Sequence, residues 1–217
     1  DSAILEAACS VGQKKAENSI AKLFVLAFLA GAYIAFGGFL AIIVGKGVNT
    51  ETLGPGVGKL LFGGVFPVGL MLVVIAGSEL FTGNCGLITP SCLRGNASWG
   101  GLLKNWVIVY IGNFVGSLFV AYFLSYLTGL TSGEPYFSAT KAIAESKVHL
   151  TFVQAFFRGI GCNWLVCLAV WLALSSEDII GKIWGIWFPI MAFVTLGFEH
   201  SVANMFFIPL GMFNGAN

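Results

Sequence analysis

A polar motif occurs twice inside segments of the chain that are otherwise apolar. The pattern G-x-E-x-x-x-x-N fits residues 77–84 and again residues 197–204, and each motif position is 120 residues further along in the second segment (197 − 77 and 204 − 84). A carboxylate in such surroundings costs roughly 3 kcal/mol or more unless it meets a partner or a water-filled path. The repeat therefore indicates an internal duplication in which each half carries one polar break.

Composition places the chain in a lipid bilayer. Hydrophobic residues make up 57% of the 217 residues and charged residues only 10%, with a mean hydropathy of +0.89, whereas a soluble domain carries about 25% charged residues. The 29 glycines suit closely packed membrane helices, because small residues let helix backbones approach. The formal net charge of +1 offers no basic surface for nucleic acid.

Apolar segments long enough to cross a membrane lie at 23–45, 60–93, 105–133, 151–174 and 183–213. Residues 2–20 predict an amphipathic helix at the membrane surface, and the polar residues 134–149 predict a loop. The second segment is interrupted by its motif. The fifth is interrupted by Glu199 and His200 and later by Pro209. Two broken segments in corresponding positions of a duplicated membrane protein point to a transport site.

The duplication also predicts the extent of the fold. We expect one transmembrane domain over residues 1–217, with a first half of about 1–130 and a second half of about 131–217. The 120-residue offset places the counterpart of the third segment near 225–250. The expected fold is therefore an all-α membrane protein of three plus three spans with two broken helices, whose sixth span lies past Asn217.

Two longer segments resemble the signature segments of the formate–nitrite transporter family. They are AGSELFTGN at 76–84 and GFEHSVANM at 197–205; KVH at 147–149 and CNWLVCLA at 162–169 also resemble the pattern of its fourth span. The resemblance covers essentially the whole chain. It implies an aquaporin-like fold with inverted halves, assembled as a homopentamer with one pore per subunit, in the cell inner (plasma) membrane as a multi-pass protein. It also implies that small monovalent anions or their acids pass: formate first, then nitrite, with hydrosulfide open and acetate or lactate in some branches.

Within the two breaks, His200 is the leading candidate for a functional side chain. An imidazole changes its charge close to neutral pH, although a histidine in an apolar segment can also be a core residue bonded to a neighbour. The resemblance implies that the hydroxyl of Thr82 hydrogen-bonds His200 across the pore. We expect Glu79 and Glu199 to accept hydrogen bonds from backbone N–H groups freed at the breaks. Asn204 either caps its turn or donates to a passing anion.

Two further features depend on the resemblance. Lys147 stands at the start of the fourth span, where the resemblance favours attraction of anions into a vestibule over a solvated loop lysine. A narrow apolar ring excludes hydrated cations, and the resemblance implies that the constriction consists of Phe66, Leu70, Leu80, Phe81 and Phe193.

An intramembrane enzyme using His200 and Glu199 as base and orienter is the alternative from another class. Adjacent residues on a helix point about 100° apart, and the sequence has no obvious nucleophile motif beside them. The five cysteines form no CxxC pair and sit mostly in apolar runs, which is typical of small buried hydrophobic residues rather than metal ligands or disulfides. We therefore expect no metal, no cofactor and no enzymatic activity.

Overall fold

The structure, a computed structural model, describes residues 2–216, and within that part of the chain all regular structure is helical. In chain order the helices are α1 (Ser2–Glu17), α2 (Ile20–Lys46), α3 (Thr50–Leu53), α4 (Pro55–Val65), α5 (Val68–Ala76), α6 (Phe81–Leu93), α7 (Trp99–Phe119), the π-helix η1 (Val120–Tyr126), α8 (Tyr136–Val148), α9 (Phe152–Leu174), α10 (Ile179–Leu196) and α11 (Ser201–Phe213).

Five helical stretches of the described chain are long and apolar enough to cross a membrane. They are α2, α4 with α5, α7 with η1, α9, and α10. Each stretch overlaps one of the predicted apolar segments, and the second and fifth segments continue past their breaks into α6 and α11. The prediction of an all-α membrane protein is confirmed. The expected sixth span lies outside the described residues.

The second and fifth segments are each broken by the same backbone device. Gly77 ends α5 with φ 80° and Gly197 ends α10 with φ 83°, both in the left-handed region that glycine adopts at little cost. Leu80 and His200 then precede α6 and α11 in an extended conformation. The motif glycine therefore closes one half-helix and lets the chain start another within the membrane.

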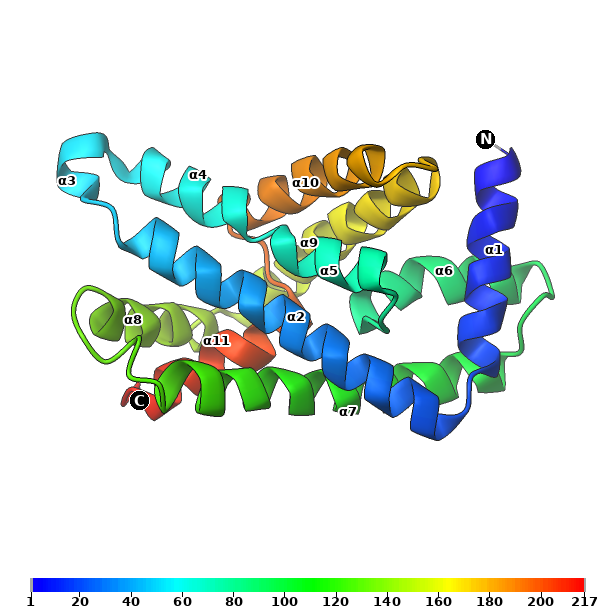
Figure 1. Ribbon diagram of the computed structural model, residues 1–217, viewed down its shortest axis with the longest axis horizontal. Helices are drawn as coiled ribbons and strands as arrows, with labels where there is room; N and C mark the ends of the chain where they lie inside the picture. Colours follow the sequence, from blue (N-terminus) through cyan, green and yellow to red (C-terminus); the bar gives the residue numbers. More distant parts are fainter. Residues whose placement is uncertain (1, 217) are drawn as a thin grey trace.

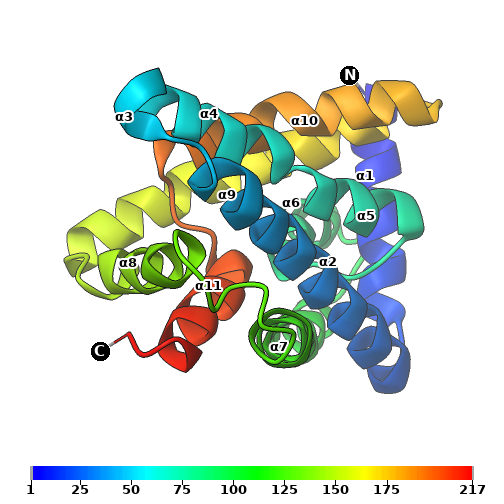
Figure 2. The same ribbon diagram turned by 60° about the vertical axis from the view of Figure 1, so that its left-hand side comes forward.

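Helix α2 occupies the middle of the molecule. Figure 1 shows it running between the α4–α5 pair and α7, and it packs against all three. Figure 2 shows α7 close to end-on, with α11 on one side of it and α2 on the other. A Cβ atom on Gly31 would lie 2.0 Å from the carbonyl oxygen of Asn113, and one on Gly116 would lie 1.9 Å from that of Phe28. Glycine is required at both positions for this close approach of α2 and α7.

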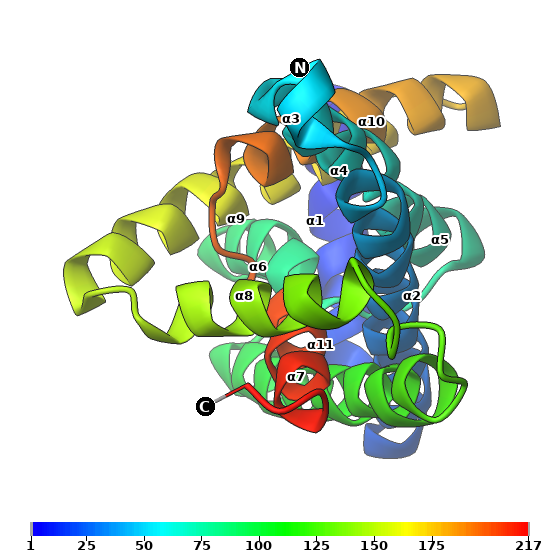
Figure 3. The same cartoon turned by 90° about the vertical axis from the view of Figure 1, so that its left-hand side faces the viewer.

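Two local predictions are wrong. The polar stretch 134–149 contains helix α8, which lies across α11 (Figure 3). Thr140 and Ala144, one helical turn apart, form its buried face, and a Cβ atom on Gly211 of α11 would lie only 2.3 Å from the Ala144 Cβ. Pro209 does not interrupt the last segment, because it lies within α11; membrane helices tolerate proline where neighbouring groups satisfy the freed carbonyl.

Candidate functional site

Glu79 lies in the first break, where it is 4% exposed and surrounded by donors. The Nζ atom of Lys15 lies 3.0 Å from its Oε1. Asn84 donates through Nδ2 to Glu79 Oε2 at 2.7 Å, and Asn105 Nδ2 is 3.5 Å from the same oxygen. A buried carboxylate is stabilised when an opposite charge and N–H donors replace its lost water. Lys15 therefore ties α1 to the first break.

Glu199 lies in the second break with the same kinds of partner. Lys147, in the last turn of α8, donates from Nζ to Glu199 Oε2 at 2.9 Å, and Asn204 Nδ2 donates to the same oxygen at 2.7 Å. Lys147 is thus held in an ion pair. The prediction that these carboxylates accept hydrogen bonds from freed backbone N–H groups is wrong, because a lysine and an asparagine occupy each of them. A full opposite charge compensates a buried carboxylate better than a neutral amide does.

The two breaks also repeat one backbone contact. The N–H of each motif glutamate donates to a carbonyl of a neighbouring span, that of Leu26 at 3.2 Å in the first half and that of Arg158 at 3.3 Å in the second. Leu26 and Arg158 are 132 residues apart, as are Lys15 and Lys147. The internal duplication therefore reaches beyond the motif to the helices that support it.

Asn113 satisfies the backbone groups exposed by the first break. Its Oδ1 accepts from the N–H of Phe81 at 3.0 Å, while its Nδ2 donates to the carbonyls of Glu79 at 2.9 Å and Ala27 at 2.8 Å. Asn113 is fully buried on α7. Sequence reasoning did not assign it a role in the site, although an asparagine inside the longest uncharged run was a usable signal.

His200 is 4% exposed at the start of α11, and both of its ring nitrogens are engaged. Nδ1 accepts from the backbone N–H of Ala203 at 3.0 Å, so the imidazole caps α11. Nε2 lies 3.1 Å from Thr82 Oγ1, in the contact that the resemblance implies. Because Nδ1 accepts, the neutral ring is assigned a proton on Nε2 that it donates to Thr82. The hydroxyl proton of Thr82 is then free to be donated elsewhere.

Two cavities open toward this region from opposite ends of α9. The larger, about 500 Å³, reaches Arg158 and His200. The smaller, about 280 Å³, reaches Leu174 and Asn84. Arg158 and Leu174 are separated by about 24 Å at 1.5 Å per helical residue. The larger cavity therefore reaches His200 itself, and the smaller one reaches Leu80 and Gly83, which lie next to Thr82 in the chain.

Buried apolar side chains lie where the cavities approach each other. Phe66 and Phe193 line the larger cavity with ring centroids 6.0 Å apart, and the Phe193 ring stacks on His200 at 5.7 Å. Leu70 and Leu80 line the smaller cavity. All four of these apolar side chains are 2% exposed. The region between the cavities is thus formed by buried apolar side chains apart from the Thr82–His200 contact.

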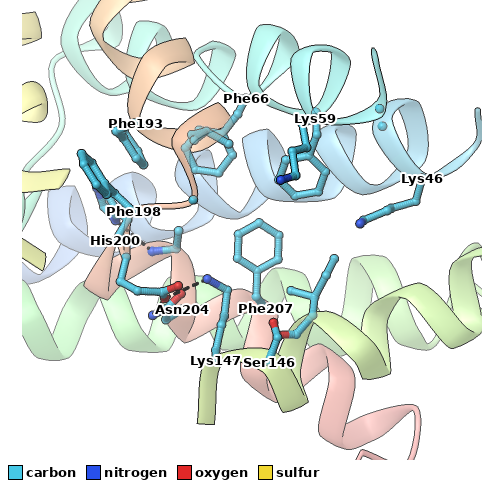
Figure 4. A pocket seen from close by; sticks show the side chains of 18 of the residues that line it. Lys46, Lys59, Phe66, Ser146, Lys147, Phe193, Phe198, His200, Asn204 and Phe207 are labelled. Carbon is cyan, nitrogen blue, oxygen red and sulfur yellow. Dashed lines mark hydrogen bonds and ion pairs between the residues drawn. The ribbon is translucent and has the colours of Figure 1, made fainter. Parts of the chain in front are cut away.

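Phe81 is placed differently from the rest of the predicted constriction. Its ring packs against Trp106 at 5.8 Å and Tyr110 at 5.1 Å, both on α7, and it lines neither cavity. Phe207, which sequence reasoning missed, lines the larger cavity instead. Its ring lies 5.4 Å from the Nζ atom of Lys147, and Figure 4 shows it beside Lys147, facing the open part of the cavity.

Positive charge surrounds both cavities. The larger cavity is lined by Lys46, Lys59, Lys147 and Arg158. Among the described residues, Glu199 is the one carboxylate that lines it. The smaller is lined by Lys15 and Lys182. Within residues 2–216, no three His, Cys, Asp or Glu side chains are grouped so that they could hold a metal ion. The side chains that line the cavities can therefore donate hydrogen bonds and provide a positive electrostatic potential.

Comparison with known proteins agrees with this arrangement. A family model described as formate/nitrite transporter matches residues 2–217. A "probable formate transporter" of Methanothermobacter thermautotrophicus is 54% identical, with 96% of this chain and 81% of the relative covered. The "formate channel BtFdhC" of Bacillus thuringiensis is 47% identical over 98% of this chain and 81% of that protein.

Solved structures show the same likeness. One described as an "FNT family ion channel" superimposes with a TM-score of 0.90 at 33% identity, covering 100% of this chain and 85% of that one. Another, a "pentameric formate channel with formate bound", has a TM-score of 0.78 at 38% identity, over 89% of this chain and 75% of the other. By sequence and by fold, this chain belongs to the formate/nitrite transporter family.

Proposed function

We propose that this protein is a channel that passes formate, as the anion or as its acid, through a pore in each subunit of a homopentamer in the plasma membrane. The observation that carries the proposal is the 3.1 Å contact between Thr82 and His200, placed between two cation-lined cavities and beside buried apolar side chains. The names of the relatives support formate as the first substrate, and one solved relative is a pentamer.

The charges of the cavities favour anions at both mouths. Low-dielectric walls of aromatic and aliphatic side chains focus the field of the lysines and raise the local anion concentration. A hydrated cation meets the opposite field and then an apolar constriction where it cannot keep its water. The cavities thus select for negative charge before any specific contact is made.

Donors at the constriction replace the water that the anion loses. The hydroxyl proton of Thr82 is free because its oxygen accepts from His200, and the Nε2–H of His200 can turn from Thr82 to the anion. Burying an anion without such donors is prohibitive, and protonation of a weak acid removes the charge altogether. His200 is the titratable side chain placed where that proton can be exchanged.

The enzyme alternative loses its support. The chain belongs to a family of transporters, and the two residues that it requires have separate partners. His200 contacts Thr82 and Ala203, whereas Glu199 binds Lys147 and Asn204.

Uptake of isotopically labelled formate into proteoliposomes tests the proposal. We expect uptake well above that of protein-free liposomes, inhibited competitively by nitrite and by hydrosulfide because these small monovalent anions meet the same donors. Acetate is expected to compete less, since its methyl group has to pass Phe66 and Phe193. Uptake no faster than in protein-free liposomes would contradict the proposal.

A further inference from the structure

The larger cavity is lined by three cations with no acidic partner in the part of the chain that the structure describes. Within residues 2–216, ion pairs join Lys15 to Glu79 and Lys147 to Glu199, and no others are formed. Lys46, Lys59 and Arg158 line the same cavity, and Glu199, its one carboxylate, is already paired. The excess positive charge of this cavity therefore comes from these three side chains.

The three cations come from different elements and share one space. Lys46 is the last residue of α2, Lys59 is on α4 and Arg158 is on α9. Figure 4 shows Lys46 on the side of Phe207 away from His200, and Lys59 between Phe66 and Lys46. Lys46 Nζ also lies 6.0 Å from the ring centroid of Phe62. Aromatic walls beside like charges raise the potential at the centre of the group.

The smaller cavity lacks an equivalent group. Its Lys15 is paired with Glu79, which leaves Lys182 as its only lining cation without a carboxylate partner among the described residues. Part of this difference in charge arises because Arg158 occupies, in the second half of the chain, the position that the uncharged Leu26 holds in the first half. The two mouths of the proposed pore thus differ by about two unit charges.

We propose that Lys46, Lys59 and Arg158 form a second anion-binding site, which holds a small monovalent anion such as formate before it reaches the constriction at Phe66 and Phe193. The site makes the channel asymmetric, because anions are concentrated more strongly at the larger cavity than at the smaller one. Current carried by anions that enter through the larger cavity is therefore larger than current of the opposite polarity. This inference rests on the proposed function.

Recordings of single pentamers in planar bilayers of neutral lipid, with equal sodium formate on both sides, test the site. The rectification ratio does not depend on which way a pentamer inserts. We expect the wild type to rectify at about 10 mM salt, where the Debye length is about 30 Å, and to lose most of this at 1 M, where it is about 3 Å. Neutralising either Lys46 or Lys59 alone is expected to lower the rectification ratio about twofold, because each removes the potential of one unit charge from the larger cavity.

The variants give opposite predictions for the two mouths. Lys46→Gln with Lys59→Gln is expected to bring the ratio close to one, and Arg158→Gln to lower it. Lys182→Gln is expected to raise it, and Lys14→Gln, an exposed lysine of α1 that lines neither cavity, to leave it unchanged. Gel filtration of each variant is the control that checks whether it assembles as the wild type does.

The possible failures are distinguishable. A wild type that neither carries formate current nor takes up labelled formate contradicts the proposed function itself. Formate uptake without current overturns the second site and its rectification alone. Formate current that rectifies equally in the wild type and in the double lysine variant overturns the second site and leaves the channel intact. A variant effect that appears only when phosphatidylglycerol is added also overturns it, because the lysines are then bound to lipid headgroups.

Discussion

Replacing Lys147 with methionine is expected to lower formate uptake roughly tenfold at low ionic strength, from the Coulomb energy of a nearby unpaired charge. The substitution removes a positive charge and also leaves Glu199 as an uncompensated carboxylate, because the two form a 2.9 Å ion pair with side chains only 14% and 13% exposed. A negative group at that depth repels the permeant. Initial uptake rates at several ionic strengths measure the effect, which becomes smaller as salt screens the cavity.

A second substitution separates the loss of the lysine from the exposure of the carboxylate. Lys147→Met combined with Glu199→Gln removes both charges and keeps the Asn204 contact possible, so uptake is expected to recover most of the way. Lys14→Met, on the exposed face of α1, serves as the matched control and should behave as the wild type. An unimpaired Lys147→Met single variant would show that the ion pair has no part in permeation.

Replacing His200 with asparagine is expected to preserve anion conductance in part and to abolish the pH dependence of formate uptake. Asparagine is a good helix N-cap, so its side-chain oxygen can accept from the Ala203 N–H as Nδ1 does now, and its amide remains a donor toward Thr82. What it cannot do is titrate. In the wild type we expect uptake to rise as external pH falls, because a proton taken up with formate removes the charge that makes its passage through the apolar constriction costly.

The measurement pairs electrical current with proton flux in the same liposomes at several pH values. Proton-coupled uptake is expected to fall by about tenfold or more in His200→Asn, in line with the loss of a positioned acid–base group, while current falls less. Protein-free liposomes correct for formic acid that crosses the lipid unaided. If His200→Asn kept the wild-type rate and the wild-type pH profile, the imidazole would be a capping residue only.

The sequence predicted the parts of the fold that depend on local pattern. Hydropathy located the five segments, each broken one counted with its second half-helix, to within about seven residues at either end, since a bilayer demands about 20 apolar residues whatever the surrounding structure. The breaks were predicted because Gly77 and Gly197 are followed by a carboxylate, a combination that a continuous membrane helix does not accommodate. Helix α8 was missed because its charged residues hid the two small buried ones, Thr140 and Ala144.

The partners of the carboxylates could not be predicted because they are set by tertiary structure. The motifs repeat at an offset of 120 residues, whereas Lys15 and Lys147 repeat at 132. Part of this difference comes from the supporting spans themselves: α2 has 27 residues and its counterpart α9 has 23. A search at a single offset therefore passes over Lys15, although it occupies in the first half the place of Lys147 in the second.

Phe81 is the member of the constriction implied by the resemblance that lines neither cavity. It stands next to Leu80 in the signature segment, and adjacent residues at a helix start point about 100° apart, so the two rarely face the same space. Leu80 lines the smaller cavity and Phe81 packs on α7. Phe207 and Lys59 were not assigned to the site because one was an ordinary apolar residue and the other an ordinary loop lysine until the fold placed them in one cavity.

The reversal potential under a formate gradient tests the central claim most directly. With sodium formate tenfold more concentrated on one side of a planar bilayer, a pore that passes only the monovalent anion reverses at roughly 59 mV, with the sign set by formate. We predict a value close to this limit for the wild type, with sodium contributing little because both cavities are lined by cations. A potential near zero, or one with the sign set by sodium, would contradict an anion-selective pore through Thr82 and His200.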